Sequence, residues 1–268
     1  MIIRKNAAEI AKMEASGAVL AAVFDLLEGM IRPGVRTEEL DRAAERLIRS
    51  RGATPTFKGY RGFPAAICAS PNELVVHGIP GRYALKPGDI ISIDVGVTLG
   101  GWVSDAARTF AVGPVQASAE RLLRATEEAL YAGIAKATVG NRVGDISHAI
   151  QSVAEGAGLS LIRQLVGHGV GRSMHEDPQV PNVGTPGRGV RLIEGMVLAI
   201  EPMTAIGRPA VRVGADGWGV FTLDRSLTAH FEHTVAICAQ GPRILTPWHL
   251  PPAERTVAGA VLEGSRRA

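Results

Sequence analysis

The sequence predicts a fold of mixed helices and strands, of the α/β or α+β class, built from two related halves. Segments with helical spacing occur between short apolar segments, and this mixture is typical of both classes. Residues 34–40 and 140–146 each begin a helical segment of the same length, 106 positions apart. Residues 87–94 and 194–201 each end an apolar run in a carboxylate. Because both pairs repeat at nearly one offset, we interpret them as parts of a duplicated half.

Length and composition indicate a globular protein. The chain has 268 residues, 46% of them hydrophobic and 21% charged, and a chain of this size can bury a large core. Its longest apolar run, residues 18–24, is far shorter than the roughly 20 residues of a membrane-spanning helix. The basic start MIIRK is followed by no apolar targeting core, so we expect neither a membrane segment nor a signal peptide.

Cysteine content and charge point to a cytoplasmic protein without a specific nucleic-acid partner. Cys68 and Cys238 are the only cysteines, too few for a disulfide framework, which favours a reducing compartment. The formal net charge is only +3, and the basic residues are scattered apart from a small cluster at Arg266 and Arg267. This distribution argues against sequence-specific binding of nucleic acid.

Four helices are predicted from apolar spacing and capping residues. In the first, one face carries positions three and four apart: 10, 13, 17, 20, 24, 27 and 31. Asn6 and Glu9 match a capping box at its start. The second helix begins at Thr37, a suitable N-cap, and ends near Gly52. Similar patterns predict two more helices, over residues 117–137 and 144–155.

Strands are predicted from four apolar runs, over residues 90–97, 102–112, 196–203 and 229–237. With the helices they predict a single domain over residues 1–246, whose halves are about 1–112 and 113–246. The remaining residues, 247–268, include Pro251 and Pro252 and a polar end. We expect this C-terminal tail to be an appendage with little core of its own.

Asp94 and Asp105 face each other across the predicted strand pair of the first half. Gly100 and Gly101 supply its turn. If the turn centres between residues 99 and 100, the two acids lie directly opposite on one face, while the apolar face is buried. Because facing like charges destabilise a strand pair, we expect a cation, a shared proton or a basic side chain beside them.

The second half places two further acids in apolar runs. Glu201 ends MVLAIE before Pro202, which fits a strand end, and Glu232 lies within AHFEHTVAI. A single acid in such a place is usually solvated or caps a turn. Four of them, two in each half, are harder to explain in this way, because burial without partners would cost roughly several kcal/mol per ion.

His168 adds an imidazole to the four carboxylates. It lies in GHGVGRSMHEDP, residues 167–178, seven positions before His175. Oxygen ligands with one nitrogen ligand suit Mn, Fe, Co or Zn. Five ligands are more than one catalytic zinc takes, so they fit two ions that share carboxylates and a water. The sequence has no HExxH, GxSxG or P-loop motif, and GHGVG only half matches a dinucleotide fingerprint.

The chain also resembles the type I methionine aminopeptidases over roughly residues 5–245. The segments that carry the resemblance are FKGYRGFPAAICASPNELVVHGIP, DIISIDVGV, GGWVSDAARTF, VGHGVGRSMHEDPQVPN, GMVLAIEPM and FEHTVAI. It implies the pita-bread fold, an α+β fold of two pseudo-symmetric halves whose antiparallel sheet is covered by helices. Only 26 positions separate His175 from Glu201, which is similar to type I, since type II enzymes carry a large helical insert there.

The resemblance implies a role for each candidate metal ligand. The ligands would be Asp94, Asp105, His168, Glu201 and Glu232. Asp105 and Glu232 would bridge two divalent ions, drawn from Co, Mn, Fe, Zn or Ni. Asp94 would bind one of these ions, and His168 with Glu201 the other. Glu201 would also carry a proton from the attacking water to the leaving nitrogen.

Substrate contacts are implied in the same way. His175 would contact the scissile amide and stabilise developing charge, and His77 would lie near the departing amine, although an ordinary loop histidine explains it as well. The methionine pocket would comprise Tyr60, Phe63, Cys68, Met174 and Trp218, with core packing as the plain alternative. The other histidines, His148, His230 and His233, are given structural roles only.

Three positions depart from the family pattern. Met174 stands where phenylalanine is frequent and Phe57 where cysteine is frequent, so the exact side-chain preference stays open. Ala106 follows Asp105 where threonine is frequent, which removes a hydroxyl beside a ligand and could shift the metal affinity. None of the five ligands is lost.

The implied function is removal of the N-terminal initiator methionine from nascent proteins and peptides, with preference for a small second residue. The resemblance also implies a monomer, and the mild basicity permits docking on the ribosome. Two alternatives stay open. One is a Xaa-Pro aminopeptidase or prolidase, which usually carries an extra N-terminal domain for which this chain leaves no room. The other is a non-catalytic binding protein, although such relatives have typically lost metal ligands.

Overall fold

The structure is a computed structural model, and it describes residues 1–250. Its helices are α1 (Ala7–Met30), α2 (Thr37–Ser50), α3 (Ala117–Ala135) and α4 (Val143–Gly156). A short 3₁₀ turn, η1, covers Tyr60–Gly62. Within this part of the chain, no helix combines the length and the apolar character that crossing a membrane requires.

Antiparallel strands make up four sheets between residues 1 and 250. The first contains β1 (Thr54–Pro55), β2 (Ile67–Pro71), β4 (Ile90–Leu99) and β5 (Trp102–Ala111). The second contains β7 (Gly167–Gly169), β8 (Glu176–Val180), β9 (Val197–Ile200), β14 (His233–Cys238) and β15 (Gly241–Ile244). Two smaller sheets contain β6 (Ser160–Leu161), β10 (Met203–Ala205) and β13 (Thr228–His230), and β3 (Leu74–Val76), β11 (Val211–Val213) and β12 (Val220–Thr222).

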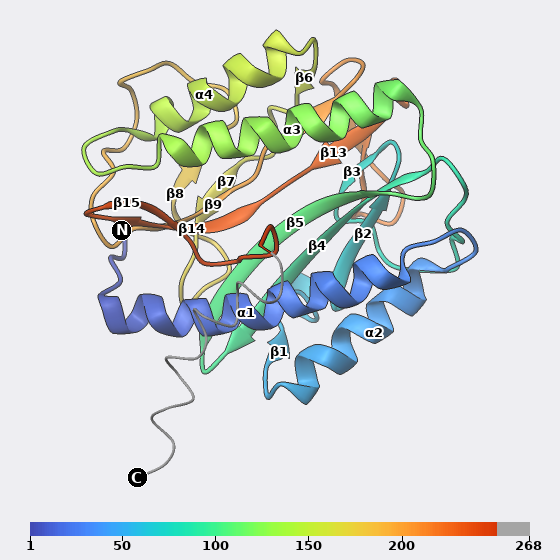
Figure 1. The fold of residues 1–268 in the computed structure, drawn as a ribbon, viewed down its shortest axis with the longest axis horizontal. Coiled ribbons are helices and arrows are strands. Elements are labelled where there is room, and N and C mark those ends of the chain that lie inside the picture. The colour runs from blue at the N-terminus through green and yellow to red at the C-terminus, as the bar shows by residue number, and fades with distance from the viewer. Residues whose placement is uncertain (251–268) are drawn as a thin grey trace.

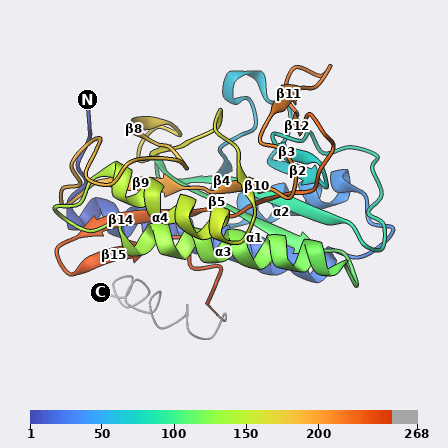
Figure 2. The same ribbon diagram turned by 90° about the horizontal axis from the view of Figure 1, so that it is seen from above.

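The helices and the loops lie on opposite sides of the strands. Figure 1 shows α1 and α2 alongside the first half and α3 and α4 alongside the second. Figure 2 shows all four helices along one side, with β8, β11 and β12 toward the other. The apolar faces of the helices are thereby buried against the sheets, which confirms the α+β class.

The internal repeat is visible in the backbone. Helices α2 and α4 each have 14 residues. Each is preceded by a glycine with positive φ, Gly34 at 91° and Gly140 at 97°. The amide of Gly34 donates to the carbonyl of Leu85, and that of Gly140 donates to the carbonyl of Leu192, over 2.7 and 3.0 Å. The same turn and the same long-range bond therefore occur once in each half, as the duplication predicts.

Helix starts agree with the sequence in one case and differ in the other. At α1 the predicted capping box is confirmed, because Asn6 accepts from the Glu9 amide and Glu9 accepts from the Asn6 amide. At α2 the N-cap is Arg36, not Thr37. The Thr37 hydroxyl instead exchanges hydrogen bonds with the backbone of Gly81, so it fixes a loop and leaves the cap position to its neighbour.

The two strands predicted over residues 196–203 and 229–237 are each broken at an acid. β9 ends before Glu201 and β10 begins after Pro202, while β13 ends before Phe231 and β14 begins after Glu232. β9 pairs with β14, and β10 pairs with β13. Proline cannot donate to a strand ladder, and the Glu232 amide donates to Ala107 on β5 instead. The two interruptions lie opposite each other, between the β9–β14 pair and the β10–β13 pair.

The second residue of the predicted tail, Trp248, belongs to the core. Trp248 is only 4% exposed. Its ring stacks on His233 at 4.4 Å between centroids, and its Nε1 donates to the Glu232 carbonyl over 3.1 Å. The packed part of the chain thus includes Trp248, and residues 251–268 of the predicted tail lie outside the described residues.

Gly17 of α1 lies directly against the C-terminal part of the second half. A Cβ built there would overlap the carbonyl oxygen of Leu245, whereas one built on Gly29 of the same helix meets nothing within 4 Å. We expect Gly17→Ala to lower the free energy of unfolding by about 1–3 kcal/mol or more, because a backbone atom cannot move aside. Gly29→Ala is the matched control and should raise it by about 0.5–1 kcal/mol. Urea unfolding of both variants measures these free energies. Equal changes in the two variants would contradict the close contact between Gly17 and Leu245.

Candidate metal centre

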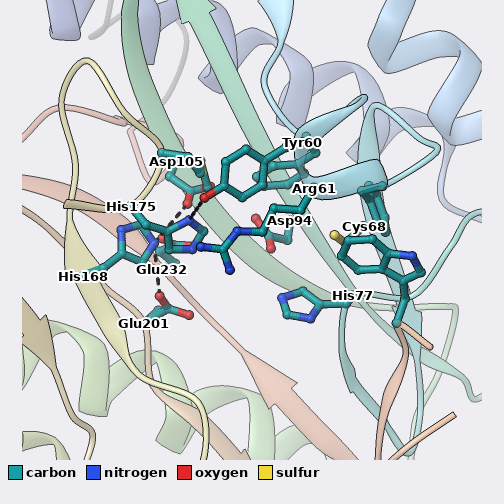
Figure 3. A pocket seen from close by; sticks show the side chains of 14 residues that line it. Tyr60, Arg61, Cys68, His77, Asp94, Asp105, His168, His175, Glu201 and Glu232 are labelled. Atoms are coloured by element: carbon teal, nitrogen blue, oxygen red, sulfur yellow. Dashed lines mark hydrogen bonds and ion pairs between the residues drawn. The ribbon is translucent and has the colours of Figure 1, made fainter.

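The five predicted ligands converge on one cavity, although they come from both halves of the chain. They lie on β4, on β5, on β7, directly after β9 and between β13 and β14, and they are Asp94, Asp105, His168, Glu201 and Glu232. Figure 3 shows their side chains pointing toward one another. The cavity has a volume of about 180 Å³. Every residue predicted for the site lines it, including His77, His175 and the methionine-pocket residues.

Asp94 and Asp105 share a face of the hairpin, but they are not directly opposite. Asp105 pairs with Gly96, and Asp94 pairs with Ala107. The turn therefore centres one residue later than expected, with positive φ at both Gly100 and Gly101, as a tight two-residue hairpin turn requires. The two acids are diagonal neighbours, which still places both carboxylates on one side of the sheet.

Three of the buried carboxylates are only partly satisfied by the described part of the chain. One oxygen of each has no hydrogen-bond partner among residues 1–250: Oδ1 of Asp94, Oδ1 of Asp105 and Oε1 of Glu232. Burial, followed by the charges of the neighbouring acids, raises the pKa of Asp94 and of Glu232 well above their usual values. Burial raises the pKa of Asp105 too. Unpaired acids of this kind fit a divalent cation, which would satisfy their free oxygens and offset their repulsion.

His168 presents one ring nitrogen to the acids. Its Nδ1 lies 2.8 Å from the carbonyl of Gly169, and since a carbonyl only accepts, Nδ1 donates there. Nε2 then lies 3.6 Å from Asp105 Oδ2 and 3.6 Å from Glu201 Oε1. An imidazole fixed by a backbone bond through one nitrogen is how metal-binding histidines are usually oriented.

His175 and Tyr60 form the rim beside the acids. The Tyr60 hydroxyl lies 2.8 Å from His175 Nδ1, and their rings stack at 5.5 Å between centroids. Burial, with the nearby charge of His168, lowers the pKa of His175 to about 4. At neutral pH the ring is therefore neutral. When the Tyr60 hydroxyl donates to Nδ1, Nε2 carries the proton and can donate to a bound carbonyl.

A buried ion pair fixes the loop that carries His175. Lys5 Nζ lies 2.6 Å from Glu176 Oε2, and both side chains are almost fully buried. The other oxygen of Glu176 accepts from the amides of Arg172 and Ser173. Because Glu176 directly follows His175, these contacts hold the histidine in place.

The other wall of the cavity is apolar. Phe63 packs edge-on against Trp218 at 5.1 Å and against Phe57 at 6.5 Å between ring centroids. Cys68 and Met174 belong to the same cluster. Aromatic and sulfur surfaces of this kind suit an unbranched thioether. His77 closes the far side with a positive φ of 59°, and burial lowers its pKa.

Comparison with known proteins places this site in a family. A model of metallopeptidase family M24 matches residues 11–239. The chain belongs to metallopeptidase family M24. It is 55% identical to a methionine aminopeptidase of Clostridium perfringens, over 92% of this chain and 99% of the relative.

Two solved structures share the fold. A methionine aminopeptidase of Rickettsia prowazekii matches with a TM-score of 0.91 and 40% identity, over 92% of this chain and all of that one. A prolidase of Pyrococcus furiosus matches with a TM-score of 0.75 and 22% identity, over 91% of this chain and 65% of that one. The first confirms the resemblance to methionine aminopeptidases and the pita-bread fold, whereas the second shows the fold alone.

Two residues of this site do not follow from the sequence. Arg61 lines the cavity without a predicted role, and His230 has only a structural role in the prediction, whereas Phe57, expected to alter the pocket, does line the cavity. His230 is 1% exposed, and its Nε2 lies 3.5 Å from Glu201 Oε2. The signal was present, because His230 precedes Glu232 by two residues in an apolar run, which places both on one face. By contrast, His233 has the structural role expected, since its Nδ1 lies 3.0 Å from the Thr246 hydroxyl.

The free energy of unfolding of the metal-free protein should fall as the pH rises from 7 to 9. Burial opposes a charge on His168, but the carboxylates of Asp105 and Glu201 outweigh it and raise the pKa of His168 to about 9. A folded-state pKa above the unfolded value contributes stability that is lost as pH rises through the folded pKa. Metal-free protein should therefore melt at lower temperature at pH 9 than at pH 7, and the gap to the Mn-loaded protein should widen. A gap that narrows over this range would contradict the assignment.

Proposed function

We propose that this chain is a metal-dependent methionine aminopeptidase that removes the N-terminal methionine from proteins and peptides. The observation that carries the proposal is the convergence of five metal-ligand side chains beside a small, largely apolar cavity. The acids provide the hydrolytic chemistry, and the aromatic and sulfur wall accepts one long side chain. The names of the relatives agree with this assignment.

We assign two divalent ions to the centre. Asp94 would hold one, His168 and Glu201 the other, and Asp105 and Glu232 would bridge them. Such ions supply a water that is ionised near neutral pH. The pairwise separations of 3.6 Å about His168 Nε2 are suited to donors around a single ion.

The protein's own groups would move the protons and orient the peptide. Glu201 accepts the proton of the attacking water and delivers it to the leaving nitrogen. His175 donates from Nε2 to the oxygen of the scissile carbonyl, where negative charge develops. His77, on the opposite side of the cavity, donates near the departing amine. Tyr60 holds His175 in the tautomer that this step needs.

Narrow access beside the histidines supports a preference for a small second residue. Tyr60, Arg61 and His175 gather at one side of the cavity (Figure 3), so a branched or large side chain there would displace them.

We place the enzyme in the cytoplasm as a monomer acting on nascent chains. The two cysteines support a reducing compartment, because Cys68 and Cys238 are both free.

Peptide release with defined metals tests the function. We expect metal-loaded protein to release methionine from Met-Ala-Ser at least about 100-fold faster than from Met-Leu-Ser, a difference of about 2.7 kcal/mol in barrier. An Ala-Pro peptide tests the Xaa-Pro alternative, and the metal-free protein is the control. Cleavage of Ala-Pro without release of methionine would favour a prolidase. Binding of Met-Ala-Ser without any cleavage would favour a non-catalytic protein.

A further inference from the structure

His230 lies on the opposite side of Glu201 from His168. Glu201 Oε1 is 3.6 Å from His168 Nε2, and Glu201 Oε2 is 3.5 Å from His230 Nε2. His230 Nε2 is also 3.9 Å from Glu232 Oε2. One carboxylate is therefore placed between two imidazoles, each facing a different oxygen.

These residues make up a second triad of potential ligands. Asp105, His168 and Glu232 form one group whose donor atoms lie within 4.8 Å of one another, and Glu201, His230 and Glu232 form another. Glu232 belongs to both. The second group adds His230 to two acids already assigned to the centre, since Glu201 faces His168 through Oε1 and His230 through Oε2.

The imidazole of His230 is buried without a hydrogen bond to any residue between 1 and 250. Both of its ring nitrogens lack a hydrogen-bond partner in the described part of the chain, although the residue is 1% exposed. A buried polar group left in this way is costly. His168 differs, because its Nδ1 already donates to a backbone carbonyl. His230 thus has a free nitrogen aimed at two acids.

The backbone holds this orientation. The His230 amide donates to the Thr109 hydroxyl, and that hydroxyl donates to the His230 carbonyl, both over 2.9 Å. His230 also pairs with Met203 across β10 and β13. Ligands carried by fixed strands are placed more accurately than ligands on loops.

We propose that His230 is a sixth protein ligand of the metal centre and binds a divalent cation together with Glu201 and Glu232. Separations of 3.5 and 3.9 Å are long for hydrogen bonds between these atoms. They suit ligand atoms that each lie about 2.0–2.2 Å from one shared metal ion. The added nitrogen favours borderline ions such as Co, Fe, Ni or Zn over Mg or Ca. This inference rests on the metal-dependent function proposed above.

X-ray absorption of the Co-loaded wild-type protein tests the inference without any substitution. We expect scattering from two imidazoles per protein, from His168 and His230. A single imidazole would overturn the inference. The measurement does not depend on activity, so it stands even if a variant fails to fold.

Titration calorimetry with Co(II) and Mn(II) gives the second test. We expect His230→Ala to weaken the binding of one ion about 10–100-fold, more for Co(II) than for Mn(II), and to change the Co(II) absorption spectrum. His230→Gln should restore part of the affinity through its amide oxygen. His148→Gln, on the exposed face of α4, is the control and should bind as the wild type does. Unchanged affinities and an unchanged spectrum in both His230 variants would overturn the proposal.

The two proposals fail in different ways. Protein that binds no divalent ion, or that binds ions and releases no methionine, contradicts the proposed function. Protein that binds ions and releases methionine, with one imidazole per protein and no effect of His230→Ala on affinity, contradicts only the role of His230.

Discussion

Replacing Glu201 with glutamine is expected to abolish peptide hydrolysis while leaving the protein folded. The amide has nearly the same shape, but it cannot accept a proton from the attacking water. General acid–base catalysis alone contributes about 10²–10⁴-fold, and Glu201 Oε1 also lies 3.6 Å from His168 Nε2, a separation that suits two ligands of one ion. We therefore expect kcat/KM for Met-Ala-Ser to fall by at least about 10³-fold.

The fold should tolerate this change, because the main chain at Glu201 is held independently of the carboxylate. The Asn182 side chain donates to the Glu201 carbonyl over 3.0 Å. Circular dichroism and the melting temperature measure the fold, and metal content separates loss of an ion from loss of the proton carrier. Glu128→Gln on the exposed face of α3 is the matched control. Turnover at the wild-type rate in Glu201→Gln would refute the proton transfer assigned to this residue.

Removal of metal is expected to have the second large effect. Prolonged dialysis against a chelator should bring methionine release to background, because the attacking water depends on bound ions to ionise near neutral pH. Adding back Mn, Co or Fe should restore most of the rate, whereas potassium should not. Full activity in protein shown to be free of metal by elemental analysis would contradict the entire mechanism.

Metal removal should also destabilise the protein. Asp94, Asp105 and Glu232 would then be left as buried acids with raised pKa values, and ligand binding to the native state stabilises it by mass action. The melting temperature should therefore increase with added Mn. A melting temperature that does not respond to the ion would show that these acids do not hold it.

The sequence predicts the fold well where the pattern is local or repeated. The four helices follow from apolar spacing, and the duplication follows from two matching offsets, because both signals are contained in short segments. The N-cap at Arg36 and the strand breaks at Glu201 and Glu232 could not be predicted in this way. They depend on distant partners, such as Gly81 for Thr37 and Ala107 for the Glu232 amide.

The site was predicted more completely than its geometry. Every candidate ligand lines the cavity. The four acids could be predicted because carboxylates in apolar strands are unusual. The register of Asp94 against Asp105 was wrong by one residue at the turn, because the position of a tight turn is set by backbone torsions at Gly100 and Gly101. His230 was missed because a single histidine in an apolar strand is usually an ordinary core residue, and only the structure places it beside Glu201.

The contact between Lys5 and Glu176 links the start of the chain to the rim of the cavity. Lys5 precedes α1, and its own amide donates to the carbonyl of Gly195 on the segment that leads into β9. Any fusion partner joined ahead of α1 would therefore be attached close to the segment that carries His175, and its bulk would bear on that side of the cavity.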